Sequence, residues 1–153
     1  MKKVQQKYNS CVLATLAMLA NVSYEEAEEQ ARVAIIEAGL TLNGDWWSTF
    51  GYTKENVSGT IAKITAFQLG MTRFVPVARV RDAQSTGDSP DLCGKGQISI
   101  ELDIGGHSMA YEDGLVYDPG YNSDQGETWD AYLRRKGSKY ILKVVVTPLP
   151  ARN

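Results

Sequence analysis

The chain has 153 residues, of which 43% are hydrophobic and 22% are charged, a composition typical of a folded globular protein. Its length predicts a single domain over residues 1–153 that can bury a sizeable core. Sixteen basic and 18 acidic residues give a net charge of -2, which argues against a nucleic acid as partner, because nucleic-acid-binding domains carry a basic face. The longest apolar run, at 12–20, is too short for a membrane span, so no membrane association is expected.

The cysteine and histidine content excludes further classes. Cys11 and Cys93 are too few for a disulfide framework, and we expect two free thiols in a reducing, cytoplasmic compartment. These cysteines and His107, the single histidine, lack zinc-ligand spacing, so neither a metal nor another cofactor is expected. Two short basic clusters are predicted to be solvated surface, namely Lys2, Lys3 and Lys7, and Arg134, Arg135 and Lys136.

The first half of the chain has helical patterning. Apolar residues at helical spacing predict a helix over 11–20, with Asn9 or Ser10 as its cap. Residues 23–26 form a capping box that opens a second helix, which we expect to end at Gly39.

The rest of the chain turns from helical to β patterning. Residues 40–57 are predicted to be a loop or short irregular helix, 58–69 a third helix and 82–96 a loop. The β-rich segments are 71–80, 97–103, 108–112, 115–117 and 139–147, and 128–135 is predicted to be a short helix or turn. An Asp-Gly pair at 113–114 predicts a tight hairpin. Helices followed by a meander of strands indicate an α+β fold with an antiparallel sheet.

Cys11 is the first candidate for chemistry. It stands at the start of the predicted helix, where unpaired amides and the helix dipole stabilise an anion and lower the pKa of a thiol. A cysteine beside Val12 and Leu13 is equally consistent with a small buried side chain. The position alone therefore does not decide between packing and chemistry.

His107 stands in the segment GGHSMAYEDGLVYDPG, after two glycines. The Asp-Gly hairpin brings Asp118 toward the same end of the neighbouring strand, where a carboxylate would orient the imidazole. The two residues are offset by two or three positions from equal distance to the turn, which we expect the glycines or a β-bulge to absorb. The alternative is a structural histidine with a turn-forming Asp-Pro.

Gln5 precedes Cys11 by six residues, so its amide can point to the same place as the Cys11 backbone N–H. Two such donors beside a nucleophile form an oxyanion hole. Gln6 is an alternative for this role, and an ordinary surface glutamine is the simpler interpretation of either residue.

The segments QKYNSCVLATLAML and GGHSMAYEDGLVYDPG resemble the papain-like cysteine peptidases, and most of all the compact bacterial C39-like branch. The resemblance implies a papain-like α+β fold in which the nucleophile helix packs on a C-terminal antiparallel sheet. It also implies Cys11 as nucleophile, His107 as general base and acid, Asp118 as orienting residue and Gln5 as oxyanion donor. The chain departs from the family in three ways. Ser10 stands before Cys11 where many relatives carry Asp-Cys-Gly or Gly-Ser-Cys patterns, and the Cys-Gly-Ser-Cys-Trp signature of the larger papain-type enzymes is absent. The membrane-transporter segment to which the bacteriocin-processing members are fused is absent as well.

The function expected from this resemblance is a small cysteine peptidase that cleaves a peptide or isopeptide bond of a protein or peptide substrate through a thioester. A glutamine deamidase, an acyl or amine transferase and an inactive peptide-binding domain remain alternatives, and the oligomeric state is open. Four other features are predicted to have no catalytic role, namely Ser10, the Trp46-Trp47 pair, Cys93 and Asp103.

Overall fold

The structure is a computed structural model that describes residues 1–7, 10–37, 39, 90–102, 105–136 and 141–149. The predictions for 40–57, 58–69 and 71–80, and those for Trp46, Trp47 and Asp103, lie outside the described residues. The helices are α1 (Cys11–Ala20), α2 (Tyr24–Glu37) and α4 (Trp129–Lys136). The strands are β1 (Lys95–Leu102), β2 (Gly105–Glu112), β3 (Leu115–Tyr117), β4 (Glu127–Thr128) and β5 (Ile141–Pro148).

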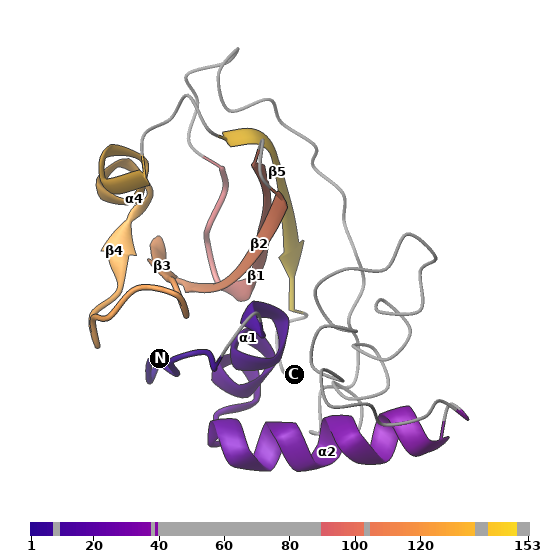
Figure 1. Cartoon of the computed structure of the whole chain (residues 1–153). Coiled ribbons are helices and arrows are strands. Elements are labelled where there is room, and N and C mark those ends of the chain that lie inside the picture. Colours follow the sequence, from indigo (N-terminus) through magenta and orange to yellow (C-terminus); the bar gives the residue numbers. More distant parts are fainter. Residues whose placement is uncertain (8–9, 38, 40–89, 103–104, 137–140, 150–153) are drawn as a thin grey trace.

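The strands form one antiparallel sheet in the order β4-β3-β2-β1-β5 (Figure 1). This sheet, together with the two helices that precede it, confirms the predicted α+β class and the antiparallel pairing. The loop predicted over 82–96 is too long at its end, because Lys95 and Gly96 already pair with Glu112 and Tyr111. The short strand β4 was not predicted.

The hairpin between β2 and β3 turns at Asp113 and Gly114, as predicted. Both residues have a positive φ, of 48° and 87°, which is the geometry that a two-residue hairpin turn requires. Glu112 and Leu115 pair directly across the turn. The hairpin therefore has the tight register on which the placement of His107 and Asp118 depends.

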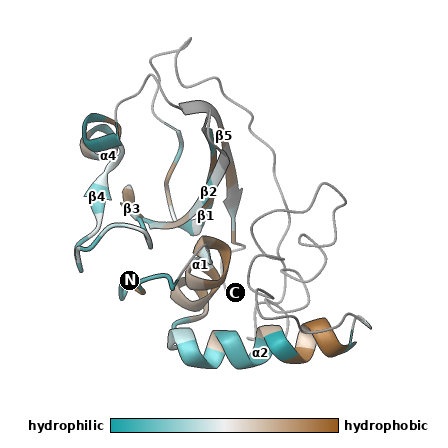
Figure 2. Ribbon diagram, in the orientation of Figure 1, coloured by the Kyte–Doolittle hydropathy of each residue, from teal (hydrophilic) through white to brown (hydrophobic). Residues whose placement is uncertain are grey.

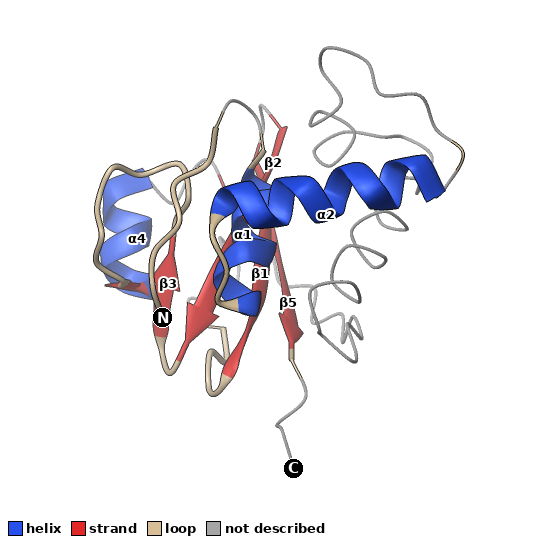
Figure 3. Cartoon of the chain, turned by 90° about the horizontal axis from the view of Figure 1, so that it is seen from below, coloured by secondary structure: helices blue, strands red, loops and turns tan. Residues whose placement is uncertain are grey.

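Helix α1 lies between the sheet and α2 (Figures 1 and 3). It is apolar on nearly all sides, as Figure 2 shows, because it packs against both neighbours. Toward α2 its side chains join a cluster of alanines, leucines, one isoleucine and one tyrosine: Leu13, Ala14, Leu16, Ala17, Tyr24, Ala27, Ala31, Ala34 and Ile35. Toward the sheet, Met18 and Leu19 pack on Ala110 and Tyr117.

The opposite face of the sheet carries the second part of the core. Alternation along β2 and β3 directs Tyr111 and Val116 to this face, whereas Ala110 and Tyr117 point to α1. Helix α4 contributes Trp129, whose ring stacks on Tyr132 at a centroid distance of 5.5 Å. The sheet is thus covered by α1 on one face and by side chains of α4 on the other.

The helix ends follow local sequence, with one exception. The Glu26 amide donates to Ser23 Oγ, as expected of a capping box, and Gly39 has a φ of 75°. Ser10 occupies the position before α1, but its side chain makes no capping hydrogen bond. Its hydroxyl instead contacts the Lys7 carbonyl and the Tyr24 hydroxyl, which links the chain before α1 to α2. Ser10 thus stands at the predicted cap position, but its side chain does not cap the helix.

Within the described ranges, no helix is both long and apolar enough to cross a membrane.

Candidate active site

Cys11 is the first residue of α1 and lies against the part of β2 that extends beyond β3. Strand β3 pairs with β2 only from Ala110 to Glu112, so the earlier residues of β2 have no β3 partner on that side. The backbone amides of Ser108, from β2, and of Val12, from the helix, both lie close enough to the Cys11 sulfur to lower the pKa of its thiol. Cys11 is not in a disulfide, and it is only 9% exposed. Two elements distant in sequence thus place amide donors around one sulfur.

His107 and Asp118 come together as predicted, although by a different geometry. The imidazole Nε2 lies 2.6 Å from Asp118 Oδ1. The pairing of β2 with β3 is regular, with Ala110 opposite Tyr117, so the predicted offset is not absorbed by a bulge between these strands. Strand β3 instead ends at Tyr117, and the turn that follows directs the Asp118 carboxylate toward His107.

Asp118 is 3% exposed, and hydrogen bonds reach both of its carboxylate oxygens. Oδ1 accepts from the Gly120 amide at 2.8 Å in addition to contacting His107. Oδ2 accepts from Arg135 Nη2 at 2.9 Å. A buried carboxylate with donors on both oxygens and a cation beside it is held ionised and in one orientation.

Arg135 is a functional candidate that sequence reasoning missed, since it was assigned to a solvated basic cluster. Its guanidinium also binds both oxygens of Glu127 and lies 3.6 Å above the ring of Tyr121. Spacing in the sequence gave no signal for these contacts, because residues eight apart are about 12 Å apart along a helix. Glu127 reaches Arg135 from β4, before α4 begins, and no pattern along the chain linked Arg135 to Asp118.

The pKa values of the three groups reflect their mutual contacts. Burial is the largest influence on the Cys11 thiol and raises its pKa, but the hydrogen bond and charge of His107, with the two amides, outweigh it and lower the pKa. Burial also lowers the pKa of His107, yet the hydrogen bonds to Asp118 and Cys11 raise it to about 9. For Asp118, burial raises the pKa, whereas His107, Arg135 and Gly120 hold it well below its usual range.

The two glutamines are placed differently. Gln5 is exposed, and its side-chain oxygen accepts from Lys3 Nζ at 3.1 Å. Gln6 is partly buried, and its backbone amide donates to the Pro119 carbonyl at 2.9 Å. A methyl group built on Gly120 would lie 3.5 Å from both Gln6 Oε1 and His107 Cε1. The structure therefore brings Gln6 beside the imidazole and leaves Gln5 at the surface.

A chain of buried hydrogen bonds runs beneath the site and joins α1 to the sheet. Gln97 Nε2 donates to Ser108 Oγ at 2.6 Å, and Ser108 Oγ donates to Thr15 Oγ1 at 3.2 Å. Thr15 Oγ1 in turn donates to the Cys11 carbonyl at 2.8 Å. The chain connects the residue after His107 to the first turn of α1, so it fixes how the thiol and the imidazole face one another.

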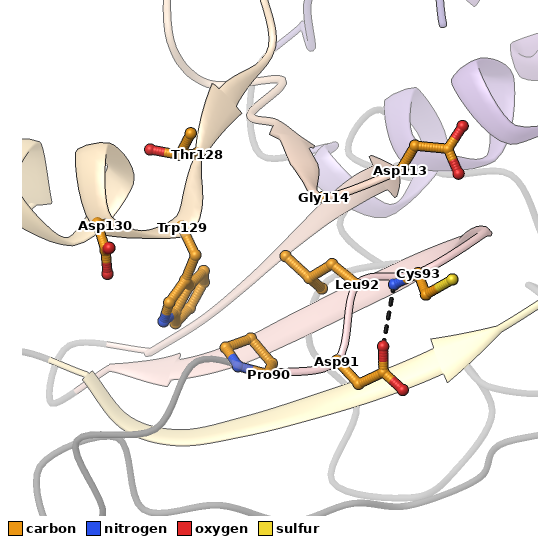
Figure 4. A pocket seen from close by; sticks show the side chains of 9 residues that line it. All are labelled: Pro90, Asp91, Leu92, Cys93, Asp113, Gly114, Thr128, Trp129 and Asp130. Carbon is orange, nitrogen blue, oxygen red and sulfur yellow. Dashed lines mark hydrogen bonds between the residues drawn. The ribbon is translucent and has the colours of Figure 1, made fainter.

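The remaining candidates are placed elsewhere. Ser10 is fully buried and bonded to Tyr24. Cys93 is exposed and lines a cavity of about 580 Å³, which Figure 4 shows together with Leu92 and Trp129. The backbone amide of Cys93 donates a hydrogen bond to the Asp91 carboxylate. None of the residues that line this cavity is a predicted catalytic residue. In the described part of the chain, no group of three or more His, Cys, Asp or Glu side chains could hold a metal ion.

Comparison of the chain with models of known families, with curated proteins and with solved structures finds no match.

Proposed function

We propose that the protein is a small thiol hydrolase of papain-like type, with Cys11 as nucleophile, His107 as general base and acid, and Asp118 as orienting residue. The observation that carries the proposal is His107, whose Nε2 lies 2.6 Å from the buried Asp118 carboxylate and whose ring is close enough to the Cys11 thiol for each group to shift the pKa of the other. A base that contacts a nucleophile and is itself oriented by a third group is the arrangement that nucleophilic catalysis requires. The packing of the nucleophile helix on the strand of the histidine is consistent with a papain-like arrangement.

The shifted pKa values support a resting thiolate paired with an imidazolium. Because Asp118 engages Nε2, Nδ1 is the ring nitrogen that remains to face the sulfur. The thiolate attacks the carbonyl carbon of a peptide or isopeptide bond, and the carbonyl electrons move to oxygen. The imidazolium then donates its proton to the departing amine as the carbon–nitrogen bond breaks. His107 next removes a proton from water as the water oxygen adds to the thioester carbonyl. The carbon–sulfur bond then breaks, the carboxylic acid product leaves, and the thiolate and imidazolium are restored.

The oxyanion formed in the attack requires donors near the carbonyl. The backbone N–H of Cys11 is one candidate, since the first amides of a helix have no partner within the helix. For the second donor we propose Gln6 in place of Gln5. Its partial burial and its proximity to His107 and Gly120 support this choice.

Alkylation with iodoacetamide over a series of pH values tests the proposal without a substrate, with the label located by mass spectrometry. Exposed Cys93 serves as the reference thiol within the same molecule. We expect Cys11 to be modified faster than Cys93 below pH 8 despite its burial, because only the thiolate reacts.

The His107→Ala variant is the matched control, and in it the rapid labelling of Cys11 should be lost while Cys93 is unaffected. If the two cysteines react equally slowly in the wild type, the protein is not a thiol hydrolase, and an inactive peptide-binding domain becomes the better explanation. Incubation of an active protein with peptides that contain glutamine separates hydrolysis from deamidation, because deamidation releases ammonia and leaves the backbone intact.

A further inference from the structure

We propose that Arg135 is a positioning residue that holds the Asp118 carboxylate in place for His107. The inference rests on the proposed function, and it adds to Cys11, His107 and Asp118 a residue that lies outside both sequence motifs. Arg135 contacts only Asp118 of the triad, so its effect on the thiol passes through the carboxylate and the imidazole.

The carboxylate would be poorly fixed without the guanidinium. The contacts of Oδ1 with His107 and Gly120 determine the position of one oxygen only. Asp118 is 3% exposed, so water has little access to replace a lost partner of Oδ2. Removal of the Arg135 donor therefore leaves a buried charged oxygen unsatisfied, and the carboxylate rotates away from its position beside His107.

Contacts other than the one with Asp118 also hold the Arg135 guanidinium in position. Its Nε and Nη2 atoms donate to Glu127, at the start of the segment that leads into α4. The ring of Tyr121 covers one face of the guanidinium at 3.6 Å, and Tyr132 lies 5.3 Å from its centre. Contacts with an acid and with two aromatic rings leave the planar group little freedom, and a preorganised donor of this kind suits a positioning role.

A positioning role and a purely electrostatic role predict opposite shifts at His107. A cation near the imidazolium opposes its charge, so electrostatics alone would raise the pKa of His107 when Arg135 is removed. If Arg135 positions the carboxylate, its removal weakens the contact between Asp118 and His107, and the pKa falls. The sign of the change therefore separates the two roles.

The experiment uses the untagged full chain, in which His107 gives the only histidine signals in a proton NMR titration. We expect Arg135→Met to lower the pKa of His107 by about one unit or more, and to slow Cys11 alkylation at pH 7 roughly tenfold. Arg135→Lys should lie between this variant and the wild type, because an ammonium keeps the charge without the planar fork. Arg134→Met, which removes an exposed charge one residue away, should match the wild type.

An unchanged or raised pKa of His107 in Arg135→Met, with native circular dichroism, would overturn the inference. If that variant does not fold, Arg135→Lys decides: a His107 pKa below that of the wild type supports positioning, and an equal value contradicts it. Failure of the proposed function looks different, because Cys11 of the wild type would then react no faster than Cys93.

Discussion

His107 lies between a buried acid and a thiol, and its protonation state decides what the site can do. Because it is the single histidine of the chain, its imidazole can be titrated directly by NMR in an untagged protein. We expect a pKa of about 9, raised from 6.5 by Asp118 and Cys11 against the effect of burial. A titration midpoint near 6.5 would contradict the ion pair.

The two partners of His107 can be separated by substitution. Asp118→Asn removes the negative charge but keeps a group of the same shape, and Cys11→Ala removes the thiolate. Either variant should lower the pKa of His107, since each partner raises it through a hydrogen bond and through charge. A variant that leaves the midpoint unchanged would show that the corresponding partner does not contact the ring in solution.

Gln6 and Gln5 form a natural pair for testing the oxyanion hole. Acylation of Cys11 by p-nitrophenyl acetate passes through a tetrahedral oxyanion, whereas alkylation by iodoacetamide does not. We expect Gln6→Ala to slow acylation by roughly 10²-fold and to leave alkylation nearly unchanged. Gln5→Ala should affect neither rate, because Gln5 is exposed and bonded to Lys3. If Gln5→Ala slows acylation and Gln6→Ala does not, Gln5 is the oxyanion donor.

At this scale, sequence could identify Cys11, His107 and Asp118 as candidates because each carries a local signal: a helix start, a glycine pair, and an Asp-Pro after a hairpin turn. The choice between two adjacent glutamines depends on which side chain the backbone turns inward, and spacing does not determine this. Arg135 could not be assigned to the site, because its contact with Asp118 depends on where α4 packs.

Among the elements, the junction between α1 and β2 matters most, because it carries the thiol and the imidazole. Thr15 makes the central link in its buried hydrogen-bond chain. Thr15→Val keeps the shape but leaves Ser108 and the Cys11 carbonyl without this partner, so we expect a loss of about 1–3 kcal/mol in unfolding free energy, measured by urea denaturation. Alkylation of Cys11 should also slow as its alignment with His107 loosens.

Thr15→Ser is the control for this link, since it retains the hydroxyl. It should recover the alkylation rate of Cys11, although it also removes a buried methyl group. Equal loss of alkylation in both variants would assign the effect to packing and not to the hydrogen bond.

Elements with strong local signals were predicted closely. Helix α1 spans 11–20 as expected, and the Asp-Gly turn lies at 113–114. Ser10 stands at the cap position of α1 as predicted, but its hydroxyl does not cap the helix because Tyr24, on the next helix, binds it. The two-residue strand β4 gave no periodic pattern, since its pairing with β3 depends on the path of the loop that precedes it.

For the whole molecule, the site should influence how stability depends on pH. A raised His107 pKa contributes stability that is present below 6.5 and is lost as the pH rises through about 9. The lowered Cys11 pKa has the opposite sign, because it contributes stability that grows as the pH approaches the unfolded value of 9.0. Between pH 6.5 and 9 the two effects oppose one another.

This opposition predicts a difference between the wild type and Cys11→Ala. Without the thiolate only His107 contributes, so the unfolding free energy of the variant should fall relative to the wild type as the pH rises from 6.5 to the lowered pKa that His107 has in the variant, by up to about 1.4 kcal/mol per pH unit. Urea denaturation at several pH values measures the unfolding free energy of both proteins. Parallel plots of unfolding free energy against pH for the wild type and Cys11→Ala would contradict the prediction. Below 3.8 both proteins should lose stability, since Asp118 then binds a proton in the unfolded chain but not in the folded site, where its pKa is lowered.

The assembly of the molecule sets the limit of sequence-based prediction. His107 and Asp118 share one hairpin, so their approach is encoded locally. Cys11 reaches them only because α1 packs between α2 and the sheet, which depends on apolar contacts among residues far apart along the chain. The family resemblance implied that the helix of Cys11 packs on the sheet, but not which strand it would meet.

The turn at 118–123 is held by hydrogen bonds from the N-terminal segment as well as by contacts with α4. Lys3 Nζ donates to the carbonyls of Tyr121 and Ser123, and the Gln6 amide donates to Pro119. The Gly120 amide is bonded to a side chain, that of Asp118, and not to a neighbouring strand. The rate at which the Gly120 amide exchanges with solvent deuterium should therefore report how often the Asp118 carboxylate moves away from it. Hydrogen exchange at this amide can thus measure local opening of the site separately from unfolding of the sheet.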